Sequence, residues 1–145
     1  MKANLIHFIT DNKFKTETLL SYFFSAIFRI EILAIKPKYL KKYWGEENRE
    51  SPEEEEKAIY KYAASVSRIV NRICTKTSWE SKCLVRALTA QKLLRRKHIH
   101  STMYLGCKMD EGKMVAHAWL RCGRMYVTGG NGVADGYAVV DKFYT

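Results

Sequence analysis

The sequence predicts an α+β protein, with helices in the first part of the chain and an antiparallel sheet in the last part. As far as about residue 97, apolar residues recur every three or four positions, which is the period of amphipathic helices. After residue 98, apolar and polar residues alternate and glycines interrupt the pattern, as in a meander of strands. A block of helices followed by a block of strands is typical of α+β proteins.

Length and composition favour one domain. The chain has 145 residues, of which 47% are hydrophobic, enough to close a single core. We expect one domain over residues 1–145, with a helical part at 1–77 and a core at 78–145 that combines a helix with a meander. The net charge of +10 favours an acidic partner of unspecified kind.

The ends and the cysteines indicate a cytoplasmic protein. The first residues show no signal-peptide pattern, and the longest apolar stretch, 18–35, is interrupted by Arg29 and Glu31. Such a stretch is short for a transmembrane helix, so we expect none. The four cysteines have neither paired spacing nor a histidine at metal-ligand spacing, so we expect no metal and no cofactor.

Two helices are predicted first. Thr16 can cap a helix that runs to about Ile35, and Pro37 breaks the pattern after it. A short basic helix then covers residues 38–44 and ends at Gly45, because glycine accepts the left-handed conformation common at helix ends.

The third helix is predicted to begin at Ser51. Serine is a good N-cap, Pro52 suits the first helical position, and Glu53–Glu55 suit the positive end of the helix dipole. The 3.6-residue period then continues to Ile73.

A fourth helix is predicted over residues 82–97, with Ser81 as its N-cap. The strands that follow are expected at 101–109, 114–122, 125–129 and 137–144. Turns at residues 110–112 and at Gly123 separate the first three strands.

Cys83 is the first candidate for chemistry. It falls in the first turn of the fourth helix, where unpaired backbone N–H groups and the helix dipole stabilise a thiolate. The same N–H groups can hold an oxyanion. The plainer alternative, that Cys83 is a small buried hydrophobe, stays open.

His117 is the matching candidate base. With the two-residue period of a strand, His117 and Trp119 share one face, while Ala118 and Leu120 share the other. A strand histidine can present its ring to a helix N-terminus packed on the sheet, which is the cysteine–histidine pairing of papain-type catalysis. The alternative of a structural core histidine stays open.

Around these two residues the chain resembles the protease component of lasso-peptide biosynthesis, a cysteine peptidase family with a transglutaminase-like core. The resemblance covers about residues 79–145 and rests on four stretches: KCLVRALTAQKLLRRK, STMYLGC, AHAWLRCG and YVTGG. It implies a transglutaminase- or papain-like core, with the nucleophile helix packed on an antiparallel sheet. Cys83 matches the family's nucleophile and His117 its base.

The resemblance also implies a substrate and partners. The enzyme would remove the leader from a ribosomally made precursor peptide, freeing the core's N-terminal amine. An ATP-dependent cyclase would use that amine to close a macrolactam ring, and a separate small leader-recognition protein would deliver the precursor. No nucleic-acid partner and no transmembrane segment are implied.

The family's third catalytic residue has no clear match in this chain. The family's orienting acid usually ends the strand after the histidine strand, where this chain has glycines around Gly129. Asp135, Asn131 or a backbone carbonyl could hold the imidazole instead, and the three options stay open.

Other functions also fit the sequence. A transglutaminase-like acyltransferase or deamidase would use the same two residues. A basic nucleic-acid or peptide-binding module, or a scaffold without activity, would need neither. The basic stretches 38–42 and 95–97 are candidate docking surfaces for an acidic partner.

Overall fold

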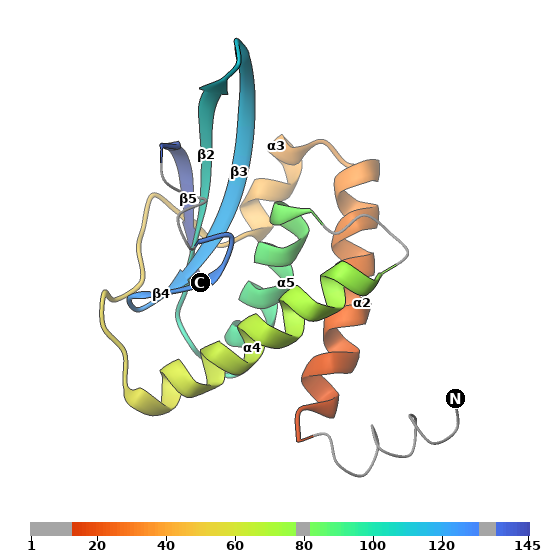
Figure 1. Ribbon diagram of the computed structural model, residues 1–145, viewed down its shortest axis with the longest axis vertical. Helices are drawn as coiled ribbons and strands as arrows, with labels where there is room; N and C mark the ends of the chain where they lie inside the picture. The colour runs from red at the N-terminus through yellow and green to blue at the C-terminus, as the bar shows by residue number, and fades with distance from the viewer. Residues whose placement is uncertain (1–12, 78–81, 131–135) are drawn as a thin grey trace.

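A computed structural model describes residues 13–77, 82–130 and 136–145 and confirms the predicted α+β class (Figure 1). The helices are α2 (Lys15–Ala34), α3 (Pro37–Leu40), the short 3-10 helix η1 (Lys41–Tyr43), α4 (Lys57–Lys76) and α5 (Cys83–Arg96). The strands are β1 (Glu46–Glu47), β2 (Thr102–Asp110), β3 (Lys113–Cys122), β4 (Met125–Thr128) and β5 (Ala138–Tyr144). The helices lie on one side of the sheet.

The sheet is antiparallel, with the strand order β1-β5-β2-β3-β4. The expected meander is right for β2, β3 and β4 but wrong for β5, which returns to pair with β2 on its other edge. This pairing buries Phe143, which is 1% exposed and meets Trp44 edge to face at 5.5 Å. The packing of Phe143 therefore favours β2 as the neighbour of β5.

The core lies between the helices and the face of the sheet that carries Ala118 and Leu120. Its α5 members recur at helical spacing and include Ala87, Leu88 and Leu94, as the sequence predicts. Small residues at Ala87 and Ala118 let the helix and the strand approach closely.

The third helix begins later than predicted. Helix α4 starts at Lys57 with Glu56 as its N-cap, and the predicted capping role of Ser51 is wrong. Ser51 is buried instead, with its hydroxyl 2.8 Å and its backbone N–H 2.7 Å from the Thr102 hydroxyl. Arg121 also donates to the Ser51 carbonyl at 3.0 Å. These tertiary hydrogen bonds hold the segment before α4 on the sheet, so it cannot enter the helix.

The other helix boundaries agree with the prediction within three residues. Helix α2 spans Lys15–Ala34, although its N-cap is Phe14 rather than Thr16. Within the described ranges, no helix combines the length and apolar character needed to cross a membrane.

One buried thiol in this core is expected to make the free energy of unfolding depend on pH. Cys122 is 0% exposed, and burial, followed by the negative charge of Glu55, raises its pKa from 9.0 to about 11. The unfolded chain therefore ionises this thiol before the folded protein does, and stability is lost as the pH rises from about 9 to about 11. We expect the free energy of unfolding in urea to fall more steeply over this range for the wild type than for Cys122→Ala. Parallel curves for the two proteins would contradict this explanation.

Candidate active site

Cys83 is the first residue of α5. The residue before it, Lys82, is the N-cap, with extended backbone at φ −71° and ψ 178°. The predicted cap, Ser81, lies outside the described residues. The first hydrogen bond of the helix runs from the Arg86 N–H to the Lys82 carbonyl at 3.0 Å. The N–H groups of the first turn thus have no carbonyl partner within the helix, as an oxyanion-binding site requires.

The Cys83 thiol is half-buried and packs against the edge of the core. No acidic side chain occupies the first turn of α5, so no carboxylate there opposes a thiolate. Among the described residues, the thiol makes no hydrogen bond.

His117 lies on β3 directly opposite Gly106 of β2. Its Nε2 atom is 2.8 Å from the carbonyl oxygen of Gly129, the residue that follows β4. A carbonyl oxygen only accepts, so Nε2 carries the proton and donates it. The tautomer therefore leaves Nδ1 as the nitrogen that can take up a proton.

Aromatic rings enclose the imidazole. Trp119 stacks on it with centroids 5.8 Å apart, and Tyr137 lies 5.2 Å away. Tyr104 in turn stacks on the Trp119 ring, with centroids 5.5 Å apart. Gly106 makes room for this stack, because a Cβ there would lie 2.8 Å from the Trp119 ring. The ring of His117 is thus fixed by one hydrogen bond and two aromatic neighbours.

A polar network supports this stack. The Arg121 Nε donates to the Tyr104 hydroxyl at 3.0 Å, and that hydroxyl donates to the Glu50 carboxylate at 2.7 Å. Burial and then the hydrogen bond to Glu50 raise the pKa of Tyr104. The same hydrogen bond lowers the pKa of Glu50. Tyr104 therefore stays neutral and donates across the neutral pH range.

The two candidates lie on elements that pack together, because α5 contacts β3. Ala118, the residue next to His117, belongs to the core that α5 helps to form. His117 and Trp119 share the other face of the strand, because successive side chains of a strand point to opposite faces. Strand β4 pairs with β3 only from Leu120 to Cys122, so His117 lies outside the part of β3 that β4 covers. No hydrogen bond links Cys83 and His117 in the part of the chain that the structure describes.

The orienting group for His117 is a backbone carbonyl in this structure. The sequence has glycines around Gly129 where the family's orienting acid usually lies, and the carbonyl of Gly129 holds the ring. The two side-chain alternatives, Asn131 and Asp135, lie outside the described residues.

Sequence reasoning missed the aromatic neighbours Tyr104 and Tyr137. Both share a face of the sheet with His117, but they come from β2 and from the residue before β5. The alternation within one strand finds Trp119, whereas Tyr104 and Tyr137 become neighbours only once the strand order is known.

The chain was compared with known proteins. The model of the transglutaminase-like superfamily matches residues 38–142. This range runs from α3 into β5 and includes both Cys83 and His117. No curated protein matches the chain, and no solved structure does either.

Proposed function

Because the chain belongs to the transglutaminase-like superfamily, generally a cysteine-based catalytic fold, we propose that it is a cysteine peptidase with Cys83 as nucleophile and His117 as base. The observation that carries the proposal is the hydrogen bond from Nε2 of His117 to the Gly129 carbonyl. In the neutral ring it leaves Nδ1 as the nitrogen that can accept a proton, on a strand packed against the helix that begins at Cys83. A base of this tautomer can accept the proton of a thiol.

In the proposed mechanism, Nδ1 of His117 takes the thiol proton as substrate binds, since such hydrogen bonds often tighten only in the substrate complex. The thiolate of Cys83 attacks the scissile carbonyl, and N–H groups of the first turn of α5 hold the oxyanion. The imidazolium gives its proton to the leaving amine, which leaves a thioester on Cys83. Nδ1 then takes a proton from water, the hydroxide attacks the thioester, and the acid leaves as the thiol is reprotonated.

The proposal extends to the substrate. We propose that the protein removes the leader of a lasso-peptide precursor and frees the core's N-terminal amine for an ATP-dependent macrolactam cyclase. The stretches that resemble the leader peptidases lie on α5, β2, β3 and β4, the elements that carry the two candidate residues or adjoin them. The net charge of +10 suits an acidic precursor or an acidic leader-recognition protein.

The test is to mix the purified protein, a candidate precursor and the leader-recognition protein, and to weigh the products. We expect two fragments whose summed mass equals the precursor plus one water, with a new N-terminal amine on the core fragment. A parallel reaction offers a glutamine peptide and a primary amine. Amine incorporation or deamidation there, with an intact precursor in the first reaction, would contradict the peptidase and favour the acyltransferase alternative.

A further inference from the structure

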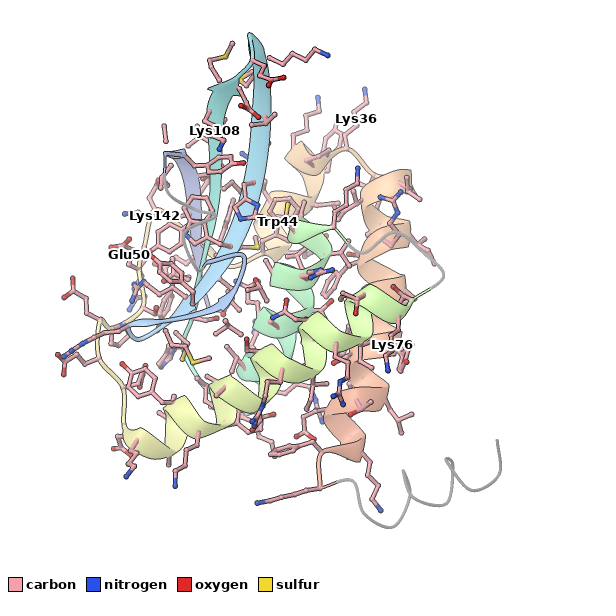
Figure 2. The ribbon with its side chains drawn as sticks, viewed as in Figure 1. Lys36, Trp44, Glu50, Lys76, Lys108 and Lys142 are labelled. Carbon is pink, nitrogen blue, oxygen red and sulfur yellow. The ribbon has the colours of Figure 1, made fainter. Side chains whose placement is uncertain are left out.

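A groove of about 640 Å³ lies between α2 and α4, which cross in Figure 1. The α2 side contributes Phe14, Thr18 and Tyr22. The α4 side contributes Ser65, Arg68, Ile69, Arg72, Ile73 and Lys76. Lys76 is labelled at the end of α4 in Figure 2. Apolar and aromatic residues of both helices thus share the groove with a row of cations from α4.

Among the described residues, no acidic side chain lines the groove beside these cations. Helix α4 itself carries no aspartate or glutamate along its whole length. Arg72 and Lys76 are exposed and form no ion pair with any described residue. Their charge is therefore available to a bound anion.

In one of the two candidate docking stretches, 38–42, the cations are already engaged. In the basic stretch 38–42, Lys41 forms an ion pair with Asp141. Lys38 and Lys42 lie 4.8 and 4.9 Å above the rings of Tyr39 and Tyr43. The row on α4 is therefore a stronger candidate for an acidic ligand than the stretch 38–42.

The groove has the length of a short peptide. An adjoining hollow shares Phe14, Ser65 and Arg68 with it and extends the surface to Lys61. From Lys61 to Lys76 the helix rises about 22 Å, which is the length of about seven residues of extended peptide. The cations Arg68, Arg72 and Lys76 follow one another at about 6 Å, close to the spacing of alternate residues in an extended chain.

We propose that this groove binds an acidic peptide segment whose apolar side chains contact Tyr22, Ile69 and Ile73. The inference rests on the proposed function in one respect, that the segment belongs to the peptidase's substrate. Neither Cys83 nor His117 lines the groove, so binding there and cleavage take place at separate sites.

Two other occupants fit less well. The chain's own residues 1–12 contain Lys2 and a single acid, Asp11, so they do not complement the row of cations. A lipid surface would match the charge, but it is flat on this scale, whereas the apolar residues here share a groove between two helices.

Binding is tested on the full chain with Cys83→Ala, using as probe a fluorescein-labelled peptide in which glutamate alternates with leucine. We expect Arg72→Glu/Lys76→Glu to raise the Kd about tenfold. The control Lys57→Glu/Lys113→Glu, an equal charge change at exposed cations outside the groove, should leave the Kd unchanged. Because Glu near the C-terminal end of a helix opposes the helix dipole and can destabilise the fold, Arg72→Gln/Lys76→Gln provides a milder variant, expected to weaken binding in the same direction. Equal Kd values for all these proteins would overturn the proposal.

Cleavage assays distinguish a failure of this inference from a failure of the proposed function. Two substrates are compared in proteins that retain Cys83: a precursor with its acidic segment and a short peptide with only the cut site. We expect the groove variants to raise the KM for the precursor and leave the short peptide unaffected. If nothing is cut but the probe still binds through Arg72 and Lys76, the peptidase is wrong and the groove stands. Normal cleavage of the precursor by the groove variants would overturn the groove alone.

Two further outcomes would assign the groove to another occupant. A synthetic peptide of residues 1–12 that displaces the probe would assign the groove to the chain's own segment. Phosphatidylserine vesicles that sediment the wild type but not Arg72→Glu/Lys76→Glu, with no binding of the probe, would assign it to lipid. Either result would overturn the proposal.

Discussion

Replacing Cys83 with alanine is expected to abolish cleavage of the precursor, lowering its rate at least about a thousandfold. The thioester cannot form without the thiol, and only substrate binding and the oxyanion site remain. The fold should survive, because Cys83 is half-buried at the first position of α5 and alanine suits a helix. We expect the free energy of unfolding in urea to change by about 1 kcal/mol or less. Mass spectrometry of the products measures the rate.

Cys107 provides a matched control for this prediction. It is also a half-buried free thiol, but it lies within strand β2 rather than in the first turn of a helix. Cys107→Ala should retain the wild-type rate. The nucleophile assignment would be wrong if Cys83→Ala cut the precursor at the wild-type rate. If Cys107→Ala were equally inactive, the loss of activity in Cys83→Ala would not identify Cys83 as the nucleophile.

Local patterns in the sequence predicted most of the fold. The three- and four-residue spacing of apolar residues placed α2, α4 and α5, and the alternation after residue 98 placed β2 and β3. The two-residue strand β1 was missed, because two glutamates carry no strand pattern and pair with β5 only through their backbone.

Local signals failed where tertiary contacts opposed them. Ser51 and Pro52 form a good helix start by sequence, yet Thr102 and Arg121 bind the backbone of this segment. Hydrogen bonds to residues about fifty to seventy positions away cannot be read from a local pattern. The return of β5 to β2 was missed for the same reason, because it depends on the packing of Phe143.

The parts of the candidate site that are side chains could be predicted from the sequence. Cys83 at a helix start and His117 within an alternating strand follow from local sequence, and the structure places them at those positions. The group that holds His117 is a backbone carbonyl, which every residue possesses, so no side-chain pattern could identify it as Gly129. The pairing of Cys83 with His117 remains a prediction.

Replacing Gly129 with alanine is expected to lower kcat/KM about a hundredfold and to cost about 2 kcal/mol of stability. Gly129 has a φ of +67°, where side chains are strained. A Cβ there would lie 2.6 Å from the Ala118 carbonyl oxygen and 3.0 Å from Nε2 of His117. Because the first contact is with rigid backbone, the Gly129 carbonyl must shift, and the imidazole loses its acceptor.

Gly112 separates this effect from simple backbone strain. Its φ of +78° is equally unfavourable for alanine, but nothing lies within 4 Å of a Cβ at this position in the β2–β3 turn. Gly112→Ala should therefore lose about 1 kcal/mol of stability and keep its full kcat/KM. Nitrogen NMR of the imidazole adds a direct measurement, since the Nε2–H tautomer of His117 should be lost in Gly129→Ala and retained in Gly112→Ala. If both variants kept the tautomer and the wild-type kcat/KM, the Gly129 carbonyl would have no positioning role, and the base would have to be oriented by another group.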